Sequence, residues 1–99
     1  MKELTSQELK QKINSGEKFV VDFYATWCGP CKYFATILEN HSGNFGVPVY
    51  KFDIESDRDI SIKYNIRSVP TLKLFNEGNP VKTHLGILSE SEFQNFSSI

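Results

Sequence analysis

The sequence is poor in cysteine, in net charge and in long apolar runs. It has two cysteines and two histidines among 99 residues, and its formal net charge is -1. A nearly neutral chain has no field that would attract nucleic acid or an anionic membrane, so we expect neither as a partner. No apolar run approaches a membrane span, and the N-terminal run MKELTSQELK lacks the hydrophobic region of a secretory signal. These absences predict a cytoplasmic protein that recognises partners by shape and local chemistry.

Length and composition predict one globular domain. Hydrophobic residues make up 39% of the chain and include eight Phe, enough for a core because a chain of this size buries about two-thirds of its unfolded surface. No linker, repeat or low-complexity segment interrupts it. We therefore expect residues 1–99 to form a single domain and a monomer.

The two cysteines are separated only by Gly29 and Pro30. A disulfide that closes so short a loop stabilises a fold by only about 2 kcal/mol, so Cys28 and Cys31 make a poor structural staple. A zinc site needs further ligands, and the two histidines match no common ligand spacing, so no metal site is expected. As a redox couple the spacing is suitable, because a thiolate at one sulfur can be attacked by its neighbour in place.

The residues around this pair predict the start of a helix. Pro30 fits a first helical turn, where its missing N–H group is no loss, and Gly29 lets the backbone turn beside it. Cys28 would then lie at or near the N-cap, where unpaired N–H groups and the helix dipole favour a thiolate. This position makes Cys28 the candidate nucleophile. Cys31, one turn further in and more buried, is the candidate resolving thiol.

Apolar periodicity and capping signals predict an α/β order of elements. Thr5, Glu8 and the pair Leu4 and Leu9 predict a helix that ends near Ser15, before Gly16. The further elements predicted are a buried strand from Phe19 to Tyr24, a helix to about Asn40, a strand from Val49 to Ile54, and a helix from Asp57 to Tyr64 that is capped by Ser56 or Asp57 and ends at Asn65. Strands from Pro70 to Phe75 and from Val81 to Leu85 follow, joined by a loop over residues 76–80. Ser89 and Glu92 repeat the capping pattern and predict a last helix that buries Phe93 and Phe96. The first two long strands should be parallel, since a helix connects them, and the last two antiparallel.

Asp22 and Trp27 stand out against their surroundings. Asp22 interrupts an apolar strand; burial would raise its pKa, which is typical of acid–base groups near a nucleophile. The alternatives for Asp22 are a satisfied buried carboxylate or an exposed position on a wrongly assigned strand. Trp27 could be a core aromatic, but its place on a loop directly before Cys28 favours the wall of a substrate groove.

The run VVDFYATWCGPCK over residues 20–32 closely resembles the active-site segment of the thioredoxin family, and the order of elements is that of the same family. The resemblance implies the thioredoxin fold, an α/β fold with a mixed four- to five-stranded sheet and helices on both faces. It also implies a protein-disulfide reductase that acts on disulfide-containing protein substrates through a redox-active Cys28–Cys31 disulfide. Such a protein needs no bound cofactor and is reduced by a separate thioredoxin reductase.

The resemblance also assigns roles to residues that their own pattern leaves open. It implies that Asp22 lies beneath the disulfide as the proton acceptor for Cys31, with Lys51 near it. Taken alone, Lys51 would be a solvated strand residue, and Val69 and Pro70 an ordinary start of a strand. The resemblance instead implies a cis proline at position 70 that faces the disulfide. The implied substrate groove consists of Trp27, Gly29, Pro30, Val69, Pro70 and Gly86.

Three positions depart from the family's usual residues, and two rival functions remain. Thr36 replaces a helix-kinking proline, Tyr24 a tryptophan and Asn65 a glycine; these changes concern the bend of the second helix and packing rather than the chemistry. A disulfide oxidase or isomerase on the same fold is disfavoured, because Gly-Pro rather than Gly-His separates the cysteines. A binding module that uses the fold to grip one protein partner is the other alternative.

Overall fold

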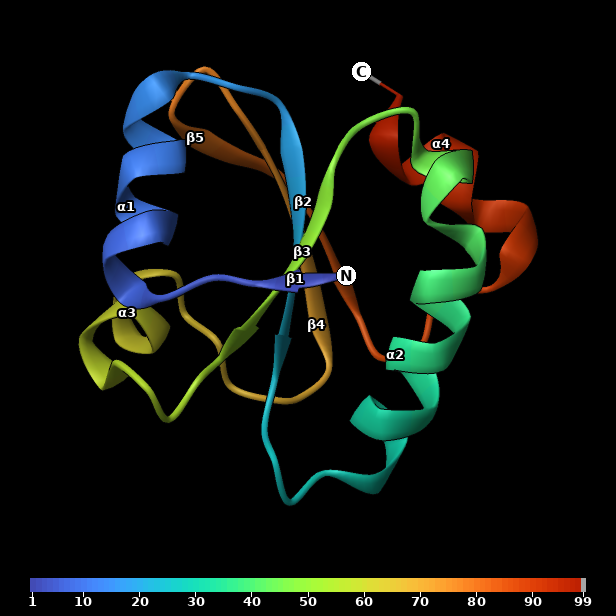
Figure 1. The fold of residues 1–99 in the computed structure, drawn as a ribbon, viewed down its shortest axis with the longest axis horizontal. Coiled ribbons are helices and arrows are strands. Elements are labelled where there is room, and N and C mark those ends of the chain that lie inside the picture. The colour runs from blue at the N-terminus through green and yellow to red at the C-terminus, as the bar shows by residue number, and fades with distance from the viewer. Residues whose placement is uncertain (99) are drawn as a thin grey trace.

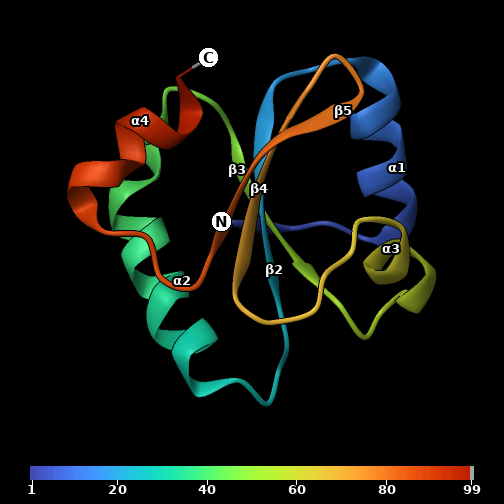
Figure 2. The same ribbon diagram turned by 180° about the vertical axis from the view of Figure 1, so that it is seen from behind.

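The computed structural model describes residues 1–98, so Ile99 of the predicted domain lies outside the described residues. A sheet separates two helical layers, with α1 and α3 on one face and α2 and α4 on the other (Figure 1 and Figure 2). The elements are β1 (Lys2–Glu3), α1 (Ser6–Ser15), β2 (Phe19–Tyr24), α2 (Gly29–His41), η1 (Ser42–Phe45), β3 (Val49–Asp53), α3 (Arg58–Lys63), β4 (Thr71–Asn76), β5 (Asn79–Leu85), η2 (Glu90–Glu92) and α4 (Phe93–Ser97), where η marks a 3₁₀ helix.

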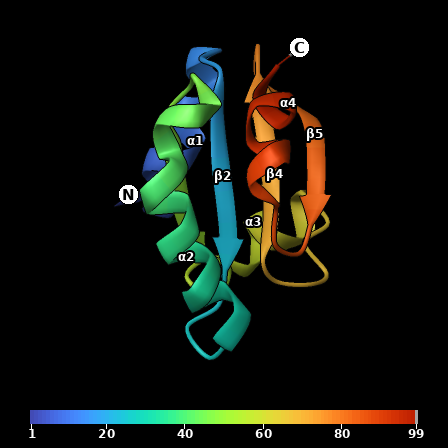
Figure 3. The same ribbon diagram turned by 90° about the vertical axis from the view of Figure 1, so that its right-hand side faces the viewer.

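The sheet is mixed and has five strands in the order β1-β3-β2-β4-β5. The central strand, β2, pairs parallel with β3, and β4 pairs antiparallel with β5, both as predicted. In addition β2 pairs antiparallel with β4, and β1 adds a short parallel edge to β3. Seen from the side of α2 and α4 in Figure 3, both helices lie in front of the strands. This arrangement confirms the predicted fold class. Among residues 1–98 no helix is long and apolar enough to span a bilayer.

The apolar run of β2 is buried on both faces, which explains why it does not alternate with polar residues. Val20 packs with Phe34 and Leu38 of α2 on one face. Val21 and its neighbours Phe19 and Phe23 pack on the other face, in the cluster that contains Leu9 of α1. Burying each such side chain stabilises the fold by about 1.5 to 3 kcal/mol, so β2 is held rigidly between the two layers.

The helix caps follow the sequence signals. Thr5 and Glu8 form the reciprocal capping box, and Gly16 ends α1 with a positive φ of 78°. Asp57 caps α3 by accepting hydrogen bonds from two backbone N–H groups, and Asn65 adopts the left-handed conformation with φ 57°. These predictions are confirmed.

The hairpin between β4 and β5 is tighter than predicted. Of the loop predicted over residues 76–80, only Glu77 and Gly78 connect the strands, with φ values of 53° and 82°. Positive φ at both positions is typical of the two-residue turn that matches strand twist. Pro80 lies in β5 opposite Phe75 and is tolerated there because β5 is an edge strand.

The C-terminal helix also begins later than Ser89. Glu92 accepts a hydrogen bond from the Ser89 N–H group at 3.1 Å, as its capping pattern predicts. The chain first forms the 3₁₀ turn η2, and α4 begins only at Phe93. Phe93 and Phe96 are buried as expected, so the pattern predicted the buried face correctly and the helical start incorrectly.

Candidate active site

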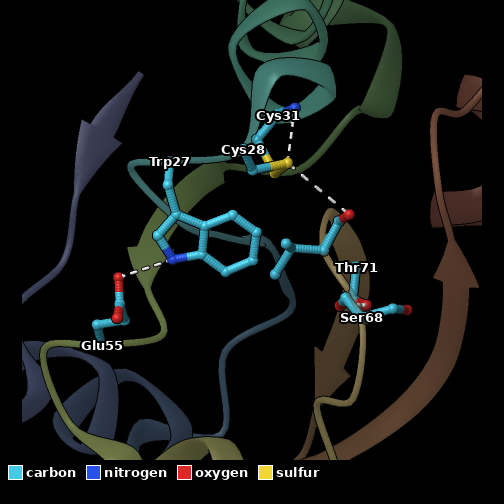
Figure 4. The surroundings of a disulfide bond; sticks show 7 residues. Trp27, Cys28, Cys31, Glu55, Ser68 and Thr71 are labelled. Atoms are coloured by element: carbon cyan, nitrogen blue, oxygen red, sulfur yellow. Dashed lines mark hydrogen bonds between the residues drawn. A yellow bond between two sulfur atoms is a disulfide. The ribbon is translucent and has the colours of Figure 1, made fainter.

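The end of β2 leads through a short loop into the N-terminus of α2, where the cysteines lie. Cys28 is the N-cap of α2, with Pro30 in the first turn, as predicted. The backbone N–H group of Cys31 donates to Sγ of Cys28 at 3.1 Å (Figure 4). Because an N-cap sulfur receives this bond and the positive end of the helix dipole, the geometry favours a thiolate at Cys28 in the reduced protein.

The two cysteines form a disulfide, with their Cα atoms 5.3 Å apart. Cys28 is 5% exposed and Cys31 2% exposed, and both pack with Ala25 in a small apolar cluster. Cys28 is therefore the more accessible of two nearly buried residues. Residues 1–98 contain no cluster of three or more side chains suited to hold a metal ion.

The segment before β4 lies against the sulfur of Cys28. Its Val69–Pro70 peptide bond is cis, as the resemblance implied, and the Val69 carbonyl oxygen lies 3.8 Å from Sγ of Cys28. The Thr71 hydroxyl donates to the Ser68 carbonyl at 2.7 Å, and the Gly86 N–H group donates to the Pro70 carbonyl at 2.9 Å. The fold thus brings this segment to the disulfide and ties it to Gly86, the residue that follows β5.

Trp27 extends from the loop before Cys28 and is 68% exposed. Its indole Nε1 donates a hydrogen bond to a carboxylate oxygen of Glu55 at 3.0 Å (Figure 4). Gly29 and Pro30, on the other side of Cys28, are exposed as well. No pattern in the sequence singled out Glu55, because it lies in another loop and the pair has no periodic spacing.

Asp22 lies under the active-site helix and is 1% exposed. Its Oδ1 atom has no hydrogen-bond partner among the described residues. Burial raises the pKa of Asp22 from 3.8 to about 7, and the nearby Lys51 ammonium only partly opposes this rise. Asp22 and Lys51 are direct neighbours across β2 and β3.

A cavity of about 220 Å³ connects this carboxylate with the buried cysteine. Asp22, Cys31 and Lys51 all contribute to its wall, together with Tyr24, Ala25, Thr26, Lys32 and Ala35. The structure therefore places the Asp22 carboxylate and Cys31, the candidate resolving cysteine, on the wall of one cavity.

Tyr24 makes contacts that the sequence did not predict. Its hydroxyl donates a hydrogen bond to the Glu3 carboxylate, and the Lys51 ammonium lies 5.6 Å from the centre of its ring. Burial and the adjacent Glu3 raise the pKa of Tyr24, so the hydroxyl stays protonated. Nothing in the local pattern of β1 and β2 indicated that these side chains meet.

A disulfide at a helix N-terminus, with the more accessible of its two cysteines at the N-cap, is suited to exchange with other thiols and disulfides. The fold and site therefore define a thiol–disulfide oxidoreductase. The Thioredoxin family model matches residues 1–98, and the chain belongs to the thioredoxin family.

Related proteins agree with this assignment. A thioredoxin of Buchnera aphidicola is 42% identical over 97 residues, which cover 95% of this chain and 90% of that protein. A Staphylococcus epidermidis thioredoxin is 40% identical over 85 residues, covering 84% and 81% respectively. Among solved structures, Plasmodium falciparum thioredoxin superposes with a TM-score of 0.85 at 33% identity, over 97% of this chain and 96% of that one. The protein thus performs thiol–disulfide exchange through the Cys28 and Cys31 pair.

Proposed function

We propose that the protein reduces disulfide bonds in other proteins, with Cys28 as the nucleophile and Cys31 as the resolving thiol. The Cys28 thiolate attacks one sulfur of the substrate disulfide, and the second substrate sulfur leaves as a thiolate that takes up a proton. The Cys31 thiolate then attacks Sγ of Cys28 and releases the first substrate sulfur. Two electrons pass to the substrate, and the Cys28–Cys31 disulfide forms. The observation that carries this proposal is the hydrogen bond from the Cys31 N–H group to Sγ of Cys28 at the helix N-terminus.

In this proposal Asp22 accepts the proton of Cys31 in the second step. The thiol of a buried cysteine needs a base close to it, because little water reaches it. Asp22 lines the same cavity as Cys31, and its pKa of about 7 suits a base that works near neutral pH. Lys51 lies beside Asp22 and stabilises its ionised form.

The residues around Cys28 would form the groove for an extended substrate segment. Val69 precedes β4, so its backbone groups can pair with a substrate chain as an added strand does. The exposed indole of Trp27 supplies an apolar wall on the other side. The proposed groove residues are Trp27, Gly29, Pro30, Val69, Pro70 and Gly86.

We further propose that the chain acts as a single-domain monomer in the cytoplasm, without a bound cofactor or metal. A dithiol serves as a reductant only where the compartment keeps thiols reduced, which the cytoplasm does. After each cycle a separate thioredoxin reductase would return the Cys28–Cys31 disulfide to the dithiol.

Insulin reduction in the presence of dithiothreitol tests the proposal. We expect the protein to accelerate precipitation of the insulin chains, and the Cys28→Ser variant to lose this effect because the proposed nucleophile is removed. A rate equal to that of dithiothreitol alone would contradict the reductase function. Replacement of both cysteines by Ser distinguishes a binding module from a reductase. The cellular role of a binding module would survive this change, whereas that of a reductase would be lost.

The reduction potential separates a reductase from an oxidase or isomerase. Equilibration with glutathione measures it, and we expect a value near the roughly -270 mV that is typical of thioredoxins. A value near about -180 mV or above, as in protein disulfide isomerase or stronger oxidants, would favour the opposite direction of electron flow.

A further inference from the structure

Three charged side chains stand in one row across the sheet, beneath the active-site helix. Residues paired across neighbouring strands point to the same face. Glu3 of β1 pairs with Lys51 of β3, and Lys51 pairs with Asp22 of β2. Lys51 therefore lies between two carboxylates, one at the surface and one buried. The distance between the Lys51 ammonium and the Asp22 carboxylate determines how strongly the charge of Lys51 lowers the pKa of Asp22.

Tyr24 lies on the same face of the sheet, two residues after Asp22 on β2. Its hydroxyl donates to Glu3, which ties the ring to the edge strand, and the Lys51 ammonium lies 5.6 Å from the ring centre. An ammonium at this distance is attracted to the negative face of the ring. Among residues 1–98, Lys51 takes part in no direct ion pair, although Asp22 is its neighbour.

We propose that Tyr24, anchored by Glu3, is a positioning residue that holds the Lys51 ammonium away from a direct ion pair with Asp22. By holding Lys51 there, Tyr24 sets the pH range in which Cys31 resolves the mixed disulfide. The proposal rests on the proposed role of Asp22 as the proton acceptor for Cys31.

The groups that face Asp22 support this assignment. On the wall of the cavity, β3 contributes Lys51 and α2 contributes Cys31 and Lys32. The neighbour of Asp22 on β4 is the apolar Leu72. Of these groups, Lys51 is the one whose charge lowers the pKa of Asp22.

The distance between Lys51 and Asp22 affects how well Asp22 acts as a base. In a direct ion pair Lys51 would stabilise the Asp22 carboxylate more strongly, because the Coulomb interaction grows as the charges approach. The pKa of Asp22 would fall, and Asp22 would become a weaker base for the Cys31 thiol at neutral pH. A lysine held over the Tyr24 ring keeps Asp22 ready to bind and release a proton in the range where the enzyme works.

The test compares Tyr24→Leu with the matched control Tyr50→Leu. Tyr50 is also half-buried, and the Lys12 ammonium lies 4.7 Å from its ring centre on the other face of the sheet. Carboxyl NMR of the oxidised protein reports the titration of Asp22, with its signal assigned through Asp22→Asn. We expect Tyr24→Leu to lower the Asp22 midpoint by about one pH unit, and Tyr50→Leu to leave it unchanged. An unchanged midpoint in Tyr24→Leu would overturn the proposal.

A double-mutant cycle with Lys51→Met shows whether Tyr24 acts through the lysine. In the Lys51→Met background, Tyr24→Leu should lose most of its effect on the Asp22 midpoint. An equal shift in both backgrounds would mean that Tyr24 only keeps water from the cavity, and would contradict the proposal. If Tyr24→Leu does not fold, Glu3→Ala replaces it. This exposed change removes the anchor of the ring, and we expect a smaller shift in the same direction.

The pH profile of the resolution step separates this inference from the proposed function. If Asp22→Asn leaves the profile unchanged, Asp22 is not the proton acceptor and that part of the proposed function fails. If Asp22→Asn removes the neutral-range midpoint but Tyr24→Leu does not shift it, only the role of Tyr24 fails. We expect Asp22→Asn to remove the midpoint and Tyr24→Leu to move it to lower pH.

Discussion

Replacement of Asp22 by Asn should change how the stability of the oxidised protein depends on pH. Asp22 is 1% exposed, and burial raises its pKa from 3.8 to about 7. The folded protein therefore holds the Asp22 proton more tightly than the unfolded chain does. As pH rises from about 4 to about 7, ionisation of this group lowers the free energy of unfolding, and above that range the penalty is constant.

The size of the effect follows from the difference of about three pKa units, each equivalent to about 1.4 kcal/mol. The penalty is about 1.5 kcal/mol at pH 5 and about 4 kcal/mol at pH 8. The asparagine of the Asp22→Asn variant does not titrate. Its buried amide, if unpaired, costs about 1 to 3 kcal/mol, but this cost is the same at both pH values. The Asp22→Asn variant should thus gain about 2.5 kcal/mol relative to the parent between pH 5 and pH 8.

Urea unfolding of both oxidised proteins at the two pH values measures this gain. Asp59→Asn is a matched control, because Asp59 is exposed in the first turn of α3 and its replacement should give a nearly constant difference. If the free-energy difference between Asp22→Asn and the parent stayed constant from pH 5 to pH 8, Asp22 would not have the raised pKa on which its proposed role depends.

Three further predictions concern the exchange reaction. In the reduced protein, iodoacetamide near neutral pH should label Cys28 before Cys31, because the helix N-terminus favours the Cys28 thiolate; peptide mapping with the reverse order would exchange their roles. Emission from Trp27, the one tryptophan, should rise on reduction because the adjacent disulfide quenches it, and equal emission in both forms would count against their contact. In Asp22→Asn the first attack should be nearly normal and resolution slower, so the mixed disulfide accumulates; rapid quenching and intact mass would detect it, and a slower attack without accumulation would show that Asp22 does not serve Cys31.

Features that depend on neighbouring residues were predictable from the sequence. The capping box of Thr5 and Glu8 and the cap at Asp57 follow local hydrogen-bonding rules, and they form as expected. Cys28 at the N-cap of α2 is of the same kind, because Gly29 and Pro30 are suited to the first helical turn. The continuous apolar run of β2 likewise indicated a central strand with both faces covered.

Features that depend on long-range contacts were not predictable from the pattern. The Tyr24–Glu3 and Trp27–Glu55 hydrogen bonds join residues 21 and 28 positions apart, and such pairs have no periodic signal. The short turn at Glu77 was missed for another reason. Its Asn, Gly and Pro neighbours are equally typical of a longer loop and of an edge strand that tolerates proline. The cis bond between Val69 and Pro70 was expected only from the family resemblance.

The most direct test of the account is to trap the reaction between its two steps. When reduced Cys31→Ser meets a peptide disulfide, intact mass should show a stable adduct, and peptide mapping should place it on Cys28. Reduced Cys28→Ser should form little adduct under the same conditions, because the remaining thiol is buried and lacks the N-cap position. A stable adduct on Cys31 in Cys28→Ser, with none on Cys28 in Cys31→Ser, would contradict the proposed direction of attack.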